Sequence, residues 1–227
     1  MCGIVGALFE KEITSFPIRA MANALKHRGP DDEGYLLCDP LEGSFESRRG
    51  TDTHPSLYFS SVEAPWPRCT RLIFGHRRLS ILDLSPAGHQ PMPDSTRRIW
   101  ITYNGEIYNY RELRQELENL GIRFFSKTDT EVILEAYKMW GKECLHKFNG
   151  MWAFALWDDR QKILFCSRDR FGVKPFYYAQ SGRNFFFASE IKPLLLLPQI
   201  PKKVSEEAIF DYLVLALPTR EPQTFFQ

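Results

Sequence analysis

The sequence predicts an α+β fold in which antiparallel strands are flanked by helices. Three observations support this class. Short β-rich segments follow one another in the C-terminal half with only tight turns between them, amphipathic helices fall between strand segments, and no internal repeat occurs. Hydrophobic residues make up 44% of the chain and charged residues 25%, proportions that are typical of a folded, soluble protein.

The charge balance and the termini exclude several classes of function. Lysine and arginine number 29 against 28 aspartate and glutamate residues, so no overall charge favours nucleic acid or an anionic membrane. The N-terminus lacks the pattern of an export signal, and no run of about 18 apolar residues occurs. The five cysteines show no metal-ligand spacing, which suits reduced thiols. We therefore expect a cytoplasmic protein without a nucleic-acid or membrane partner.

The chain is expected to enter a buried strand almost at its N-terminus. The segment from Cys2 to Phe9, CGIVGALF, is short and apolar, which is typical of such a strand. A helical stripe follows at Phe16, Ala20 and Ala24, and it stops at the turn HRGPDDEG because glycine and proline interrupt the helix. The segment EGYLLC predicts the next strand.

The middle of the chain alternates between irregular and strand-like sequence. Residues 39–71 lack a clean period and predict a long surface loop or an insertion. RLIFGHRRLSILDL predicts a strand that runs into an irregular segment, and SPAGHQPM predicts a turn. IWITYNGEIYNY alternates apolar and polar positions around Asn104-Gly105, which predicts a strand, a tight turn and the start of a helix.

Two helices and a strand meander complete the predicted domain. Asn109 with Glu112 three residues later resembles a capping box, and the helix that begins there should end at Gly121. A second helix is expected from about Thr130 to Trp140. MWAFALWD, KILFCSRD, PFYYA and NFFFASE then predict strands that are joined by turns.

The C-terminal tail predicts one more amphipathic helix, SEEAIFDYLVLAL, with Ser205 as its N-cap. The following residues, PTREPQTFFQ, end on aromatic side chains without a closing element of secondary structure. We therefore expect the sequence to be part of a longer protein.

Cys2 carries the chemistry that a hydrolytic nucleophile needs. A small second residue permits removal of the initiator Met1, after which Cys2 supplies a thiol and a free α-amine. An α-amine has an unperturbed pKa of about 7.7–8.0, so near neutrality it can accept the thiol proton and return it to a leaving group. Taken alone, Cys2 is more safely explained as the small apolar start of a buried strand.

Five further residues match the needs of acyl transfer from an amino acid. Asn104-Gly105 offers a side-chain amide beside an accessible backbone N–H, which suits an oxyanion hole. Arg78 suits an α-carboxylate, and Glu106 and Asp129 suit an α-ammonium. Each position also has a plainer explanation, namely a hairpin turn, an exposed arginine, a solvated glutamate and a helix cap. Only their combination favours function.

Eight stretches of the chain together match one known family. They are MCGIVG, LKHRGPDDEG, GHRRLSILDLSPAGHQPM, YNGEIYNYRELRQEL, TDTEVILEAY, FNGMWAFALWD, RDRFGVKPFYY and FASEIKPL. Through these stretches the chain resembles the glutaminase half of the glutamine-dependent asparagine synthetase family. The stretches cover nearly the whole chain except about residues 39–70. MCGIVG alone would also fit glucosamine-phosphate synthases and phosphoribosyl-pyrophosphate amidotransferases, whereas HRGPDDEG and RDRFGVKP favour the asparagine-synthetase branch.

This resemblance implies the fold and the role of individual residues. It implies a class II (type 2) amidotransferase domain over residues 1–195, built as the four-layer α-β-β-α sandwich of two antiparallel sheets found in N-terminal-nucleophile (Ntn) hydrolases. Cys2 matches the nucleophile, and Asn104 and Gly105 match the oxyanion hole. The implied glutamine-binding residues are Arg78, Leu79, Ser80, Ile81, Leu82, Asn104, Gly105, Glu106 and Asp129. Arg28 and Asp31 match a turn near the nucleophile, which shapes either the pocket or only the loop.

The resemblance also implies what the domain does. It hydrolyses glutamine to glutamate and ammonia, and a complete enzyme passes the ammonia to aspartate activated by ATP. Residues 196–227 are expected to be a linker helix and the start of a missing ATP-dependent synthetase domain, normally in cis. Hydrolysis itself needs no cofactor or metal, whereas ATP and Mg serve the synthetase half.

Several alternatives stay open at this point. The ammonia could serve a different acceptor, or the chain could be a non-catalytic docking domain with the same fold. A homodimer is also open. The stretch at 39–70 is longer than in compact family members and could be a modified lid, a partner contact or a tolerated surface insertion.

Overall fold

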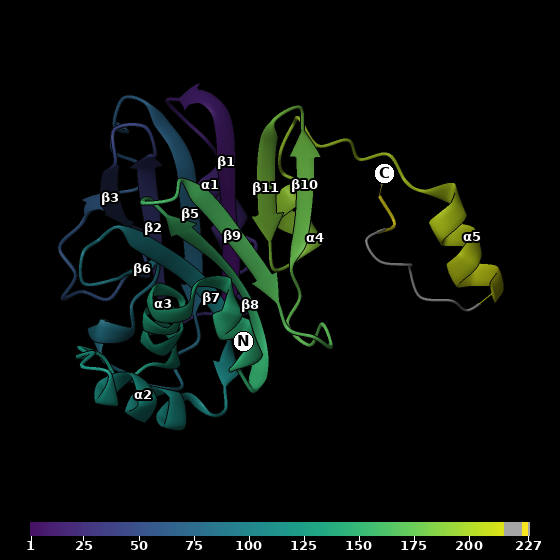
Figure 1. Cartoon of the computed structure of the whole chain (residues 1–227). Helices are drawn as coiled ribbons and strands as arrows, with labels where there is room; N and C mark the ends of the chain where they lie inside the picture. Colours follow the sequence, from purple (N-terminus) through teal and green to yellow (C-terminus); the bar gives the residue numbers. More distant parts are fainter. Residues whose placement is uncertain (216–223, 227) are drawn as a thin grey trace.

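Two β-sheets packed face to face form the centre of the structure, a computed structural model that describes residues 1–215 and 224–226 (Figure 1). The seven-stranded sheet contains, from edge to edge, the strands β10 (Tyr177–Ser181), β11 (Asn184–Ala188), β1 (Gly3–Ile13), β5 (Thr70–Arg78), β2 (Asp32–Asp39), β3 (Ser44–Arg49) and β4 (Ser60–Ser61). The four-stranded sheet contains β6 (Met92–Pro93), β7 (Ile99–Ile107), β8 (Gly150–Asp158) and β9 (Ile163–Arg168). Neighbouring strands are antiparallel except β3 and β4.

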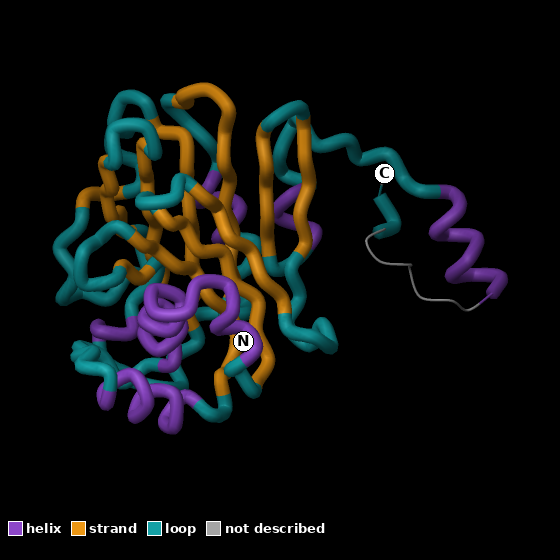
Figure 2. Tube along the Cα trace, in the orientation of Figure 1, coloured by secondary structure: helices purple, strands orange, loops and turns teal. Residues whose placement is uncertain are grey.

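Helices cover the outer face of each sheet, which gives four layers (Figure 2). The seven-stranded sheet is covered by α1 (Ile18–Asn23) and α4 (Ile191–Leu194), and the four-stranded sheet by α2 (Tyr110–Asn119) and α3 (Asp129–Trp140). The remaining helices are the 3-10 helices η1 (Pro86–Gly88) and η2 (Gly141–His146) and the C-terminal α5 (Glu206–Leu215). The predicted α+β class and the four-layer sandwich are therefore confirmed.

Three apolar layers hold these elements together. Between the two sheets, side chains such as Ile4, Phe74 and Trp100 are almost completely buried. Because side chains alternate between the two faces of a strand, the neighbouring Val5 points away from the second sheet and joins the layer under α1. Burial on both faces explains why CGIVGALF is almost continuously apolar and not alternating.

The strand prediction around Asn104-Gly105 is right, but the predicted turn is wrong. β7 runs without interruption through both residues, and Gly105 pairs with Trp152 of β8. A Cβ atom at Gly105 would lie 2.3 Å from the carbonyl oxygen of Met151, so this position needs glycine for the close approach of β8. The glycine of this dipeptide therefore allows a close contact between two strands and does not form a hairpin turn.

The loop or insertion predicted at residues 39–71 is also partly wrong, because this stretch contains β3, β4 and the start of β5. β3 extends the seven-stranded sheet beyond β2, and the buried Arg48 donates to the carbonyl oxygens of Ser61 and Pro65 at 2.8 and 2.9 Å. The residues between β3 and β4 pack against β2, where the backbone N–H of Asp52 donates to Glu33 at 2.8 Å. The stretch is a folded edge of the sheet.

The two helices predicted to end at Gly121 and Trp140 are confirmed as α2 and α3, but their caps differ from the prediction. α2 begins after Asn109, whose side chain makes no cap bond and instead donates to Lys147 O at 2.9 Å. The capping-box prediction is therefore wrong. α3 is capped by Thr128, whose hydroxyl accepts a hydrogen bond from Glu131 N at 3.2 Å. Asp129 is thus the first helical residue and not the cap, which leaves its carboxylate available for other contacts.

The C-terminal helix projects away from the sandwich (Figure 1). Ser205 lies directly before α5, and its hydroxyl accepts a hydrogen bond from Ala208 N at 3.2 Å, as predicted for an N-cap. The helix extends to Leu215, and the predicted residues 216 and 217 lie outside the described residues. Among the described residues, none of the helices combines the length and hydrophobicity that a membrane crossing requires.

Candidate active site

A cavity of about 270 Å³ opens where the N-terminus, β5, β7 and α3 meet. It is lined by nearly all residues that the sequence analysis singled out, namely Cys2, Arg78, Leu79, Ile81, Leu82, Asn104, Gly105, Glu106 and Asp129. Ser80 is the exception, because it does not line the cavity and its backbone N–H donates to Asp31 at 2.8 Å. No residue of 39–69 lines the cavity, so a lid formed by this stretch is not seen in the described structure.

Strand pairing places the Cys2 thiol at the cavity. Gly3 pairs with Arg77 across β1 and β5, so Cys2 lies beside the end of β5 although 77 residues separate it from Leu79. The thiol accepts a hydrogen bond from the backbone N–H of Leu79 at 3.4 Å and donates to the carbonyl oxygen of the same residue at 3.7 Å. The position of the sulfur is therefore set by the backbone and not by a neighbouring side chain.

The turn at HRGPDDEG contacts both sides of this junction. Arg28 Nε donates to the carbonyl oxygen of Cys2 at 3.0 Å, and its Nη1 pairs with Glu190 at 3.0 Å. Asp31 holds Ser80, as described above. The two residues thus fix the start of β1 and the loop after β5, which shapes the pocket as well as the turn itself.

Arg78 presents a buried guanidinium to the cavity. Its side chain donates to the carbonyl oxygens of Leu82, Asp83 and Ser85, and among the described residues no carboxylate pairs with it. A Cβ atom at Gly88 would lie 1.9 Å from Arg78 Nη2, so the guanidinium needs glycine at that position. An arginine held only by carbonyl groups keeps its positive charge available for an anionic ligand.

Asp129 provides the opposite charge across the cavity. Its Oδ2 atom accepts hydrogen bonds from Tyr103 Oη at 2.8 Å and from Ile107 N at 3.0 Å. Burial raises the pKa of Asp129 above its ordinary value, and these two hydrogen bonds oppose that change. Glu106, which lines the same cavity, adds a second carboxyl group. The pair suits a cationic group on a ligand.

Asn104 has a buried hydrogen-bond donor that the protein itself does not use. Its side-chain nitrogen Nδ2 is shielded from solvent and has no hydrogen-bond partner among the described residues. Leaving a buried amide donor unsatisfied costs on the order of 1–3 kcal/mol. Because Asn104 lines the cavity, this donor is a candidate partner for a ligand oxygen, as in an oxyanion hole.

The N-terminal amine is a candidate base for the proton of the Cys2 thiol. Burial raises the pKa of Cys2, so the thiol stays protonated in the free protein. Burial also lowers the pKa of the N-terminal amine, and the positive charges of Arg28 and Lys174 lower it further. In the described structure no histidine lines the cavity, which leaves the N-terminal amine as the neutral base beside the thiol. In this chain that amine belongs to Met1, which also lines the cavity.

All five cysteines are free, and the other thiols lie outside the cavity. Burial raises the pKa of Cys144 and that of Cys166 to about 12, and it raises the pKa of Cys38 as well. Hydrogen bonding to Glu12 raises the pKa of Cys69. Each of these thiols is therefore protonated near neutral pH.

Several cavity residues were missed by the sequence analysis. They are Gly88, Gln90, Tyr103, Thr128, Thr130, Met151 and Lys174. Gln90 and Lys174 lie in the matching stretches GHRRLSILDLSPAGHQPM and RDRFGVKPFYY, so those motifs carried the signal. Lys174 is almost completely buried, and within the described chain its ammonium makes no ion pair.

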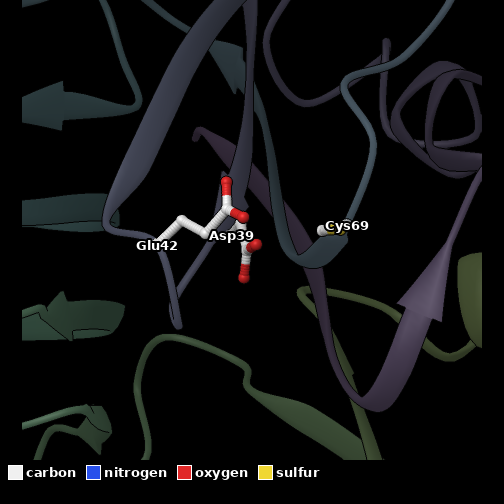
Figure 3. Close-up of side chains that lie close together, drawn as sticks. All are labelled: Asp39, Glu42 and Cys69. Carbon is white, nitrogen blue, oxygen red and sulfur yellow. The ribbon is translucent and has the colours of Figure 1, made fainter.

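A separate cluster could hold a metal ion away from the cavity. Asp39, Glu42 and Cys69 each offer a ligand atom, and these atoms lie within 4.8 Å of one another (Figure 3). Arg71 already donates to Asp39 Oδ1 at 2.9 Å, which neutralises part of the negative charge there. None of the three residues lines the cavity, so the prediction that the candidate reaction needs no metal stays a prediction.

Comparison with known proteins identifies the family of the chain. A family profile described as "Glutamine amidotransferase domain" matches residues 60–227. The chain is 40% identical to a provisionally named asparagine synthetase (glutamine-hydrolyzing) 2 of Methanocaldococcus jannaschii, over 95% of this chain and 39% of that protein. It is 35% identical to asparagine synthetase (glutamine-hydrolyzing) 3 of Bacillus subtilis, over 99% of this chain and 32% of that protein. The chain thus spans less than two fifths of either relative.

Solved structures support the fold. Glutamine phosphoribosylpyrophosphate amidotransferase from B. subtilis, solved with ADP and GMP, superposes with a TM-score of 0.67 at 21% identity, covering 85% of this chain and 43% of that one. A structure described as the allosteric regulatory enzyme of purine biosynthesis gives a TM-score of 0.64 at 21% identity, covering 86% of this chain and 43% of that one. These likenesses agree with the two-sheet sandwich.

Proposed function

The chain belongs to the glutamine amidotransferase domain family, and from that membership we propose that it hydrolyses glutamine to glutamate and ammonia with Cys2 as the nucleophile. The observation that carries the proposal is the unused, buried Nδ2 donor of Asn104 in the cavity that the Cys2 thiol enters. A nucleophile and an oxyanion donor in one cavity are the two groups that acyl transfer requires.

Glutamine is bound at both of its charged ends. Arg78 receives the α-carboxylate, and the backbone from Leu79 to Leu82 lines the same side. Asp129 and Glu106 receive the α-ammonium, which returns the pKa of Asp129 toward its ordinary range. The side-chain amide of the substrate is then directed toward the Cys2 sulfur and the oxyanion donors.

The reaction proceeds in two stages. With Met1 removed, the Cys2 α-amine accepts the thiol proton while the sulfur attacks the amide carbon of glutamine. Asn104 Nδ2 and Gly105 N donate to the resulting oxyanion, and the α-ammonium returns its proton to the nitrogen that leaves as ammonia. Water then attacks the γ-glutamyl thioester, glutamate is released and the thiol is restored. No metal or cofactor takes part in this scheme.

Asn104→Ala tests the oxyanion assignment. The substitution is expected to lower kcat by on the order of 10²–10³ with little change in KM, because the donor acts on the transition state. The unused donor makes no bond in the free protein, so the thermal midpoint should change little. The measurement is ammonia release from glutamine, with Asn119→Ala on the exposed end of α2 as the matched control. Full activity in Asn104→Ala would remove the assignment.

Lys174→Met tests the base assignment through the pH profile. In the structure the charges facing the amine of Met1 are Arg28 and Lys174, which lower its pKa, and Cys2 and Asp31, which raise it. We propose that the same charges act on the Cys2 amine once Met1 is removed. Removing the Lys174 charge therefore raises the amine pKa and reduces the neutral base at a given pH. The acid limb of kcat/KM should move to higher pH.

The exposed Lys202→Met is the matched control for this profile, and its acid limb should stay in place. An unshifted acid limb in a folded Lys174→Met protein would contradict the assignment of the amine as the base.

In the longer protein we propose that the ammonia passes to a synthetase domain in cis, where ATP and Mg activate aspartate. The relatives named asparagine synthetases support this acceptor, as does α5, whose exposed Phe210, Leu213 and Val214 leave an apolar surface for a following domain. We further propose a cytoplasmic location. Asparagine formation from aspartate, ATP and glutamine by the longer protein is the expected result, and glutamine hydrolysis without asparagine would point to another acceptor.

A further inference from the structure

The side chain of Gln90 connects β7 and α3 at the wall of the cavity. It is 5% exposed and lines the cavity directly. Its Oε1 atom accepts a hydrogen bond from Tyr103 N of β7 at 2.7 Å, and its Nε2 atom donates to Thr130 Oγ1 of α3 at 3.3 Å. One buried amide side chain therefore ties a strand of the four-stranded sheet to the first turn of a helix.

The two ends of this bridge carry different parts of the proposed site. Tyr103 directly precedes Asn104, the oxyanion donor, and Thr130 directly follows Asp129, which faces the α-ammonium. The bond from Tyr103 Oη to Asp129 is a second link between the same two elements. These buried hydrogen bonds therefore help to set the distance between the oxyanion donors and the ammonium site.

Gln90 is itself fixed from behind. His89 Nδ1 forms a hydrogen bond with Asp32 Oδ2 at 2.7 Å, and the other oxygen of Asp32 accepts from His54 N at 2.9 Å. A Cβ atom at Gly34 would lie 2.3 Å from the carbonyl oxygen of Gln90, so β2 approaches this backbone closely. Contacts with β2 therefore hold the backbone of Gln90 and of its neighbour His89 in place.

The elements on the two sides differ in how firmly they are held without Gln90. β7 pairs with β8 along its whole length, from Ile99 to Ile107. The start of α3 has no such ladder. Its hydrogen bonds to β7 are those of Asp129 with Tyr103 and Ile107, and Gln90 links the two elements through Thr130. Further along α3, apolar side chains such as Val132 and Ile133 pack in one cluster with β7. Loss of the Gln90 bridge should therefore displace Asp129 more than Asn104.

We propose that Gln90 is a positioning residue that sets the separation between the α-ammonium site and the oxyanion donors. This role rests on the proposed hydrolysis of glutamine. Because of the Gln90 bridge, binding of the α-ammonium aligns the amide carbon of the substrate with Cys2. The ammonium contact therefore raises kcat as well as substrate affinity. The bridge selects for the spacing between the amine and the side-chain amide of the substrate.

The test compares two substrates in the Gln90→Met protein. One is L-glutamine, and the other is 4-carbamoylbutanoate, which has the same carboxylate and amide groups but lacks the α-ammonium. A displacement of roughly 1 Å can cost about 10²-fold in rate, so kcat for L-glutamine should fall about 10–100-fold. The kcat for 4-carbamoylbutanoate should change by less than about threefold, because that substrate does not use Asp129. The ratio of kcat for L-glutamine to kcat for 4-carbamoylbutanoate, here called the preference for glutamine, should therefore fall.

Two further variants keep the result interpretable. Thr130→Val removes only the acceptor of the Gln90 Nε2 bond and should lower the preference in the same direction, even where Gln90→Met does not fold. Gln115→Met, on the exposed face of α2, is the matched control and should leave the preference unchanged. Equal losses with both substrates, or an unchanged preference in both cavity variants, would overturn the positioning role.

The outcome also separates this role from the proposed function. Ammonia release by the unaltered chain that depends on Cys2, together with an unchanged preference, would reject only the role of Gln90. Ammonia release that does not depend on Cys2 would reject the proposed function itself.

Discussion

Cys2→Ala is expected to abolish ammonia release from glutamine, with kcat lower by on the order of 10⁶, by analogy with the loss of other catalytic nucleophiles. The cavity places no second thiol within reach, because the other cysteines lie outside it. The groups proposed to bind the substrate are unchanged in this variant. Glutamine binding measured by calorimetry should therefore persist while turnover disappears.

Cys69→Ala is the matched control for this experiment, since it removes a thiol that lies outside the cavity. It should release ammonia at the rate of the unaltered chain. Mass spectrometry of the purified proteins should accompany the assay, because only loss of Met1 gives Cys2 a free amine. Equal ammonia release by Cys2→Ala and the unaltered chain would rule out Cys2 as the nucleophile.

Arg77→Met is expected to lower the free energy of unfolding by about 3–5 kcal/mol, which is the usual cost of removing one partner from a buried ion pair. Arg77 is 1% exposed, and its Nη1 atom lies 2.7 Å from Asp52 and 3.3 Å from Glu33. Asp52 keeps Lys26 as a partner, but Glu33, also 1% exposed, loses its only cationic neighbour among the described ion pairs. Glu33 keeps hydrogen bonds from Tyr35 Oη and Asp52 N, but a buried carboxylate without a cationic partner is costly.

Denaturant unfolding measures this loss as a lower midpoint with an unchanged slope. The matched control is Arg183→Met, which removes an exposed arginine paired with Glu10 and should change stability by only about 0–1 kcal/mol. A loss in Arg77→Met no larger than that of the control would show that the buried cluster contributes little to stability.

Local sequence patterns predict those parts of the fold whose burial is regular. Strands buried on both faces, such as β1, are almost continuously apolar, and α2 shows a single apolar face through Leu113 and Leu117. β3 escapes prediction because it is short, lies near the sheet edge and contains Ser44–Arg49, a largely polar segment. Its partners, β2 on one side and β4 on the other, become apparent only once the chain is folded.

Some residues of the candidate site could also be predicted from the sequence, and others could not. The residue types at Cys2, Arg78 and Asp129 fit a chemical requirement, so a motif could identify them before the fold was available. Gln90 meets no such requirement, because its importance depends on partners 13 and 40 residues away. At Asn104-Gly105 the local turn signal was overridden by pairing with β8, a contact that no local pattern reveals.

The distribution of the five thiols makes the protein suitable for counting functional molecules in a preparation. Cys38, Cys69, Cys144 and Cys166 lie outside the cavity, whereas Cys2 lines it. An electrophilic glutamine analogue would be carried to Cys2 by its charged ends and would alkylate that sulfur in preference to the others. The amount of label per chain would then give the competent fraction directly.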